Sequence, residues 1–354
     1  MENNNINATF DDDFAKRLDK RLFEIKAYDF YYSIKNYLPL LSQSIRGYKS
    51  QDIYISKCDT STEEMIMTAL LFYKDFDKEL YNKLNRTLTE KVYFVESPTP
   101  FISKFSLEFY DGHIKELENK ETILQISEPT NKKGLVNAVG NNFIKKYNRM
   151  FREINLNPSD DILGFVTIAH EFAHILTQSV QEMKKEKDKN AGEIESLFIE
   201  KVFIDWACKN GIFSEKEYQS CVNLNREQYL GKVILLLEEQ DILSRLKPPI
   251  TKEKLNDFEE NLRGDRNYKP LMRRLRIMAD GDRNGQRIFR YVIGEIIASE
   301  LFKDYQENRE VTTQKLKNFL NHNTEITLEK SAQLLLGDNY QDRIKNACYR
   351  GISK

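Results

Sequence analysis

The sequence predicts a mainly α fold with a small β-sheet (α+β), and three observations support this class. Apolar residues recur at three- and four-residue spacing over long stretches of the 354 residues, which is the period of helices that face a core. Short β-branched and aromatic runs are concentrated between residues 91 and 128. A hydrophobic fraction of 40%, with 21 Phe and 18 Tyr, supplies the apolar surface that a folded chain needs.

The first elements expected along the chain are helices. Residues 1–13 are polar and acidic, and we interpret them as a disordered tail. Apolar residues then follow the helical period from Phe14 to Pro39, and again over residues 63–84. These patterns predict an N-terminal helical region at residues 14–90.

A small sheet is expected next. Residues 92–95, 105–110 and 122–127 are short β-branched or aromatic segments separated by proline, glycine or charged clusters. They predict a sheet confined to residues 91–128, placed just before the most apolar helix of the chain.

Helical patterns resume after the sheet. Pro158 and the acidic residues that follow it favour a helix start near Ser159, because proline lacks an N–H group and the helix dipole favours acids there. Gly192 interrupts the pattern, and a second helix is expected from Glu193 to about Asn210. The further expectations are a central region at 91–305 that includes helices at 159–210 and a basic helical segment at 262–305, a C-terminal helical region at 306–354, and breaks at 247–249, 281–285 and 337–338.

The apolar segment 165–178 contains two of the four histidines of the chain, in an H-E-x-x-H motif formed by His170, Glu171 and His174. Positions i and i+4 share a helix face, so both imidazoles can bind one Zn²⁺ while Glu171 reaches the water on the metal. Burial of three ionisable groups without a partner is costly. The motif therefore predicts one zinc ion per chain, with Glu171 as general base. The alternative is a pair of core histidines beside a buried glutamate.

A third zinc ligand is expected on the next helix. Glu193, Ser196 and Glu200 fall on one helical face, whereas Glu195 points about 200° away from Glu193 at ~100° per residue. We predict Glu193 as the ligand, with Glu195 as the fallback. Glu200 would accept a hydrogen bond from a ligating imidazole and hold its tautomer. The alternative is that these acids lie on a solvated helix face.

These residues resemble the paired signature of the thimet oligopeptidase and oligoendopeptidase F family of zinc metallopeptidases, which are of the gluzincin type. That family reads approximately H-E-F-G-H-x-x-x-Q and, later, E-x-x-S-x-x-x-E. The matching positions in this sequence are His170, Glu171, Phe172, His174, Gln178, Glu193, Ser196 and Glu200. The resemblance covers about residues 160–305. It implies a zincin-like, mostly helical peptidase with a His, His, Glu zinc site in a channel, cleaving peptides internally.

The sequence also departs from the family. Ala173 replaces the usual glycine, Thr177 replaces a frequent histidine, and the interval from His174 to Glu193 is shorter. The whole chain is much shorter than a typical member. The oxyanion-stabilising His and Tyr of the family have no clear counterpart in residues 281–288.

Residues 289–295 are similar to the tyrosine-rich helix that the family carries near zinc. This resemblance implies that Tyr291 stabilises the oxyanion. An arginine of the same segment, Arg283, Arg287 or Arg290, is the competing candidate. Tyr291 as an ordinary core aromatic is the alternative.

The segment 262–290 is strongly basic, with nine basic and three acidic residues and a net charge of +6. Such a local positive field favours an acidic substrate or binds a substrate carboxylate. We predict Arg287 and Arg290 as substrate-binding residues. The alternative is a solvated basic face.

Bulk composition limits the partners and the compartment. The formal charge is −1, from 54 basic and 55 acidic residues, so no global attraction to nucleic acid or to an anionic membrane is expected. The four cysteines form no C-x-x-C pair and are expected to be reduced thiols. No window reaches the ~18 apolar residues of a membrane span, and the start lacks a readable signal peptide. A cytoplasmic location is expected, and export by another route stays open.

The function predicted from the sequence is that of a zinc-dependent endopeptidase acting on a peptide or protein substrate. Two alternatives stay open: a catalytically inactive zincin-like helical scaffold that binds a partner protein, and a specialised secreted protease toxin or effector with one protein target. The sequence leaves the substrate, the cleavage specificity and the oligomeric state undefined.

Overall fold

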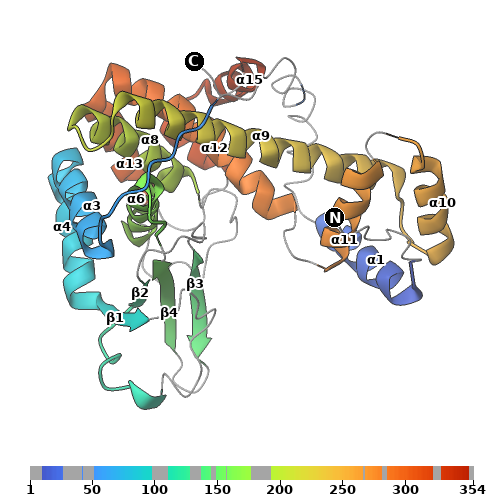
Figure 1. Cartoon of the computed structure of the whole chain (residues 1–354), viewed down its shortest axis with the longest axis horizontal. Helices are drawn as coiled ribbons and strands as arrows, with labels where there is room; N and C mark the ends of the chain where they lie inside the picture. The colour runs from blue at the N-terminus through green and yellow to red at the C-terminus, as the bar shows by residue number, and fades with distance from the viewer. Residues whose placement is uncertain are drawn as a thin grey trace. The chain divides into compact units, whose positions relative to one another are not determined.

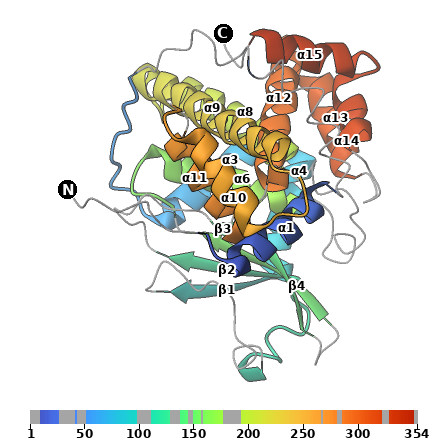
Figure 2. The ribbon, with the colours of Figure 1, turned by 90° about the vertical axis from the view of Figure 1, so that its right-hand side faces the viewer.

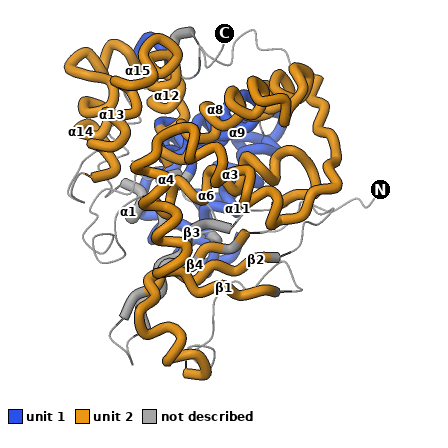
Figure 3. Tube along the Cα trace, turned by 90° about the vertical axis from the view of Figure 1, so that its left-hand side faces the viewer, with its two compact units in different colours: residues 1–49, 226–293, 345–354 blue, residues 50–225, 294–344 orange. Residues whose placement is uncertain are grey.

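The chain divides into two compact units, each assembled from segments that are distant in sequence (Figure 3). Unit 1 comprises residues 1–49, 226–293 and 345–354, and unit 2 comprises residues 50–225 and 294–344. The computed structural model describes residues 10–26, 42, 52–97, 111–127, 137–144, 149–156, 158–176, 193–265, 268–280, 285–321 and 328–350.

The predicted fold class is confirmed: the described residues form mostly helices and one small sheet (Figure 1). The sheet precedes the apolar helix with the H-E-x-x-H motif, as expected. No helix in the described part of the chain combines the length and the apolarity of a membrane span.

Unit 2 begins with two helices, α3 (Thr62–Phe76) and α4 (Lys78–Arg86), followed by the short π-helix η1 (Thr87–Lys91). The sequence predicted one continuous run over 63–84. The run is interrupted at Asp77, whose backbone is extended and whose side chain accepts a hydrogen bond from the backbone N–H of Leu80 at 2.9 Å. Such local side-chain bonds compete with the helical ladder, so the chain stops one helix and starts another.

The sheet has four strands in the order β1-β2-β4-β3. Figure 2 labels these strands. β1 (Val92–Ser97), β2 (Thr122–Ser127) and β4 (Arg149–Leu156) are parallel, and β3 (Asn137–Ile144) pairs antiparallel with β4 at one edge. The predicted strands at 92–95 and 122–127 correspond to β1 and β2, whereas 105–110 lies outside the described residues.

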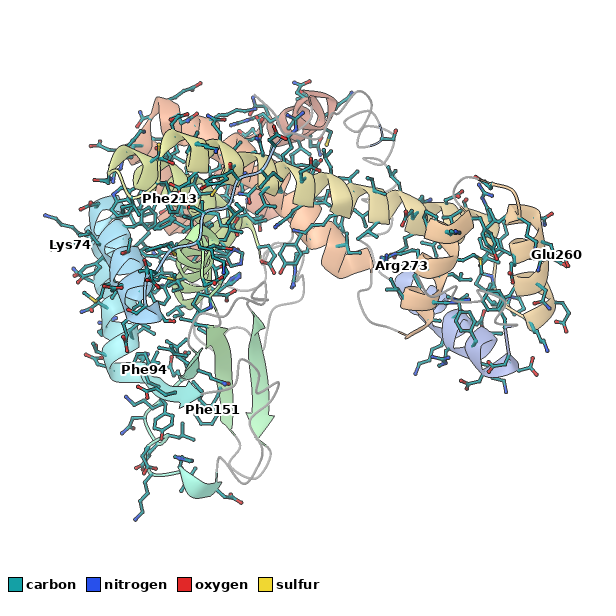
Figure 4. All side chains as sticks on the ribbon, viewed as in Figure 1. Lys74, Phe94, Phe151, Phe213, Glu260 and Arg273 are labelled. Atoms are coloured by element: carbon teal, nitrogen blue, oxygen red, sulfur yellow. The ribbon has the colours of Figure 1, made fainter. Side chains whose placement is uncertain are left out.

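The sheet extends beyond the predicted limit at residue 128, because β3 and β4 also belong to it. These two strands contain Gly, Asn and Arg, which have low or neutral β-propensity, so their pairing partners and not their composition decide the conformation. Leu117, Ile123 and Phe151 form a buried cluster of this region, while Phe94 of β1 is 51% exposed (Figure 4).

The helices that follow the sheet are α6 (Ile162–Leu176) and α8 (Ile194–Lys209). α6 begins three residues after the predicted Ser159, because the Asp161 carboxylate accepts a hydrogen bond from the backbone N–H of Leu163 at 2.9 Å and caps the first turn. α6 is buried nearly all round, and the Tyr73 hydroxyl of α3 donates to the Ala169 carbonyl at 2.8 Å. The expected continuation of this helix after Leu176 lies outside the described residues.

The first turn of α6 depends on Gly164. A Cβ at this position would lie 2.6 Å from the carbonyl oxygen of Ser159 and 2.7 Å from the sulfur of Met65. The carbonyl belongs to the backbone and cannot rotate away. We therefore expect Gly164→Ala to lower the free energy of unfolding by about 1–3 kcal/mol despite the better helix propensity of alanine.

Urea or thermal unfolding measures this effect. Gly231→Ala is the matched control, because Gly231 lies in the helix α9 (Glu215–Arg245) and a Cβ there meets nothing within 4 Å. The control should be at least as stable as the wild type. A Gly164→Ala variant as stable as the control would contradict the predicted clash.

The remaining helices confirm the helical pattern expected for the second half of the chain. The predicted break at 247–249 separates α9 from α10 (Lys252–Leu262), and the predicted break at 337–338 coincides with Gly337, whose φ of 86° suits glycine. The remaining helices of this half are α11 (Tyr268–Asp280), α12 (Gly285–Glu307), α13 (Arg309–Leu320), α14 (Leu328–Leu336) and α15 (Tyr340–Arg350).

The N-terminal helix α1 (Asp12–Lys26) begins inside the segment that was expected to be a tail. The Asp11 carboxylate accepts a hydrogen bond from the backbone N–H of Phe14 at 2.7 Å and so caps the first turn.

Candidate metal centre

α6 and the start of α8 bring two imidazoles and a carboxylate together in unit 2. His170 and His174 lie one turn apart on α6, and their Nε2 atoms are 3.2 Å from each other. Oε2 of Glu193 lies 3.6 Å from Nε2 of His170 and 3.5 Å from Nε2 of His174. Among the described residues, these three side chains form a group that could hold a metal ion.

The separations between the three atoms suit zinc. Tetrahedral coordination with bonds of about 2.0–2.1 Å places ligand atoms about 3.3–3.4 Å from one another. The observed distances of 3.2, 3.5 and 3.6 Å are close to this spacing. Two imidazoles and one carboxylate are a donor set of catalytic zinc sites, which leave the fourth position for water or substrate.

The outer nitrogen of each imidazole faces another carboxylate. Nδ1 of His170 lies 2.5 Å from Oε1 of Glu200, and Nδ1 of His174 lies 3.3 Å from Oε1 of Glu195. A carboxylate at Nδ1 accepts the proton there, which leaves the Nε2 lone pair available for a metal and fixes the orientation of the ring.

Glu195 takes a position that the sequence reasoning missed. The fallback hypothesis made it a ligand, and the helical repeat directed it away from Glu193. Glu193, however, is the N-cap residue of α8, with φ −126° and ψ 0°, so the helical repeat does not set the direction of its side chain. Glu195 is 2% exposed and faces the outer nitrogen of His174. The signal in the sequence was the position of Glu195 next to Ile194 and close to the apolar run 197–199, where a buried acid needs a partner.

Glu171 follows His170 on α6 and is 4% exposed. No hydrogen-bond partner reaches its Oε2 atom within the part of the chain that the structure describes. Burial raises the pKa of the Glu171 carboxyl above its ordinary value, although His170 and His174 act in the opposite direction. A buried carboxylate that has a raised pKa, and one oxygen not engaged in a hydrogen bond to the described residues, is suited to accept a proton.

The carboxylates around the two imidazoles attract positive charge. Burial opposes the charged form of His170, but Glu200 and Glu193 outweigh it and hold the pKa well above its usual range. At His174 burial acts likewise, and hydrogen bonds to Glu193 and Glu195 raise the pKa to about 9. Burial also opposes ionisation of Glu193, whose pKa the two imidazoles nevertheless hold well below its usual value. A cation at this group would replace the protons held there.

These pKa shifts predict that zinc affinity rises with pH. Zinc binds the neutral imidazole, so binding must expel the protons held by His170 and His174. Because both histidines of the folded protein hold their protons well above pH 6.5, affinity should increase with pH up to at least about 9, the value for His174, as the protons are lost. Competition with a calibrated chromophoric chelator measures the affinity, and calorimetry in buffers of different ionisation enthalpy measures the protons released. A pH-independent affinity without proton release would contradict the prediction.

The other predicted site residues lie elsewhere in the chain. Arg290 and Tyr291 are in the part of α12 that belongs to unit 1, where the Lys232 ammonium lies 4.4 Å from the centre of the Tyr291 ring. The Arg290 guanidinium lies 5.8 Å from the same ring. Their roles in catalysis and substrate binding stay predictions. Thr177, Gln178, Arg283 and the side chain of Arg287 lie outside the described residues.

Comparisons with known proteins give a structural likeness. No protein-family model matches the chain, and no curated protein matches it. The chain is similar in structure to a candidate peptidase from Chlamydophila abortus, with a TM-score of 0.48, 13% identity and coverage of 96% of this chain and 55% of that one. It is also similar to a candidate oligoendopeptidase F from Bacillus anthracis str. Ames, with a TM-score of 0.46, 11% identity and coverage of 96% and 56%. The chain spans about half the length of these two proteins.

Proposed function

We propose that this chain is a zinc-dependent endopeptidase in which His170, His174 and Glu193 hold the metal. One observation carries the proposal: three zinc-type ligand atoms lie within 3.2–3.6 Å of one another, and the buried Glu171 carboxylate interacts electrostatically with the residues that supply them. Among the described residues, Oε2 of Glu171 has no hydrogen-bond partner. A purely structural metal site has no use for a general base next to its ligands.

Each protein group has a defined task in the proposed reaction. When bound, zinc would lower the pKa of a water molecule and polarise the carbonyl of the scissile peptide bond. Glu171 accepts a proton from the attacking water and later transfers it to the leaving amine. Glu195 and Glu200 hold the imidazoles of His174 and His170 in the orientation and tautomer that metal binding requires.

The oxyanion that forms at the carbonyl needs a donor, and loss of one such donor typically slows a reaction by about 10²–10³. Tyr291 is the proposed donor, from its similarity to the tyrosine of the oligoendopeptidase F family. Arg287 and Arg290 are the proposed groups for a substrate carboxylate, because an arginine fork matches carboxylate geometry.

An extended peptide is the proposed substrate. β3 is an antiparallel edge strand, and the next strand of the chain, β4, leads into α6 with its two histidines. The free backbone groups of an edge strand can bind an extended peptide as an additional strand.

Zinc content and cleavage test the proposal together. Purified protein should contain zinc at an equimolar ratio by plasma mass spectrometry and should hydrolyse internally quenched peptides of a random library. A chelator should abolish cleavage and added zinc should restore it, and digestion of intact proteins in parallel shows whether they are also substrates. Zinc binding without hydrolysis of any peptide or protein would refute the peptidase, and absence of zinc binding would refute the metal site.

A further inference from the structure

Glu193, the carboxylate of the candidate metal centre, lies at the very start of its helix. It is the N-cap residue of α8, and its side chain makes no capping hydrogen bond. Its carbonyl accepts hydrogen bonds from the Leu197 N–H at 3.1 Å and the Ser196 hydroxyl at 3.2 Å, which fixes the peptide plane after Glu193. The position of the Glu193 carboxylate therefore depends on the backbone at the start of α8 and on what packs against it.

Gly294 of α12 makes that contact. A Cβ built at Gly294 would lie 3.5 Å from both the carbonyl carbon and the Cβ of Glu193, and 3.1 Å from Cδ1 of Leu197. The backbone of α12 thus passes directly against the first residues of α8, at the point from which the ligand side chain departs. Glycine inside a helix is entropically unfavourable, and close backbone approach is a common reason for its presence.

The neighbouring residue fixes the register of the two helices. The Glu295 carboxylate pairs with the Lys201 ammonium at 2.5 Å, and both side chains are largely buried, at 7% and 14% exposed. The Ser299 hydroxyl donates to the same carboxylate at 3.4 Å. Because Lys201 lies two turns along α8 from Glu193, α12 contacts α8 at two points: glycine against the ligand residue, and an ion pair further along.

We propose that Gly294 is a positioning residue for the metal ligand Glu193, an inference that rests on the zinc site proposed above. A larger side chain at Gly294 displaces the start of α8 from α12 and moves the Glu193 carboxylate relative to the two imidazoles. The backbone of His170 and His174 belongs to α6 and not to α8, so the displacement changes the distance between the Glu193 carboxylate and the two imidazoles.

Zinc affinity of glycine variants tests this role. Gly294→Val is expected to bind zinc about 10–100-fold more weakly, as for other residues that orient ligands. Gly294→Ala should have a smaller effect, since its single added carbon first meets the movable Leu197 side chain. Gly231→Val in α9 is the matched control, because a Cβ there meets nothing within 4 Å. Its affinity should equal that of the wild type.

Co²⁺ replaces zinc for the second readout. The visible absorption of Co²⁺ reports ligand geometry, which a merely destabilising substitution does not alter in the folded protein, and unfolding of the metal-free variants measures stability separately. Gly294→Val with wild-type zinc affinity and Co²⁺ absorption would overturn the inference while leaving the zinc site intact. If that variant does not fold, an unchanged Co²⁺ spectrum in Gly294→Ala overturns it. A wild type that binds neither metal overturns the proposed function, and the role of Gly294 with it.

Discussion

Glu171→Gln is expected to retain zinc and to lose peptide hydrolysis. Glutamine has the shape of glutamate but no basic carboxylate, so it cannot accept the proton of the attacking water. General-base catalysis contributes typically 10²–10⁴-fold, and we expect kcat/KM to fall by about that factor. His170, His174 and Glu193 are unchanged in this variant, so the metal should stay bound.

The measurement combines kinetics on a quenched peptide with the zinc content of the same preparation. Glu260→Gln provides the matched control, because Glu260 is an exposed residue of α10 in unit 1 (Figure 4). The control should have wild-type activity and zinc content. Equal cleavage by wild type and Glu171→Gln would remove Glu171 from the mechanism, and loss of zinc from Glu171→Gln would give it a role in metal binding instead.

Local features of the fold were predictable from the sequence. The helical period of α6 depends on residues within one or two turns, and the β-branched and aromatic composition of β1 and β2 is typical of strands. β3 and β4 could not be predicted in this way, because pairing with distant segments stabilises them. The composition of the two units could not be predicted from local sequence patterns either, because each unit is assembled from segments that are distant in sequence.

The candidate metal centre likewise has one part that could be predicted from local spacing and another that depends on how distant segments pack. The spacing of His170 and His174 alone places both imidazoles on one face of a helix. The direction of Glu193 depends on its N-cap conformation, and the contact of Glu195 with His174 depends on how α8 packs on α6. The contact of Gly294 joins segments about a hundred residues apart, and no local pattern in the sequence marks it.

Alanine at each of the three acids of α8 is expected to weaken zinc binding to a different extent. Glu193→Ala removes a carboxylate oxygen that lies within 3.6 Å of both Nε2 atoms. Its zinc affinity should therefore fall by more than the ~10–100-fold that is typical for loss of a residue that orients a ligand. Glu200→Ala and Glu195→Ala should fall within that range. The larger effect is expected at Glu200, which lies 2.5 Å from its imidazole against 3.3 Å for Glu195.

The order Glu193, Glu200, Glu195 separates two explanations of the site, because the fallback hypothesis predicts the largest loss at Glu195. Competition with a chelator measures the three affinities, and the Co²⁺ absorption shows whether a ligand or only its orientation has changed. Alanine at Glu193 should shift this absorption by removal of a donor, whereas alanine at Glu195 should leave the donor set intact. If Glu195→Ala alone lost zinc, Glu195 would be the third ligand, and the contact between Glu193 and the two imidazoles would belong only to the metal-free protein.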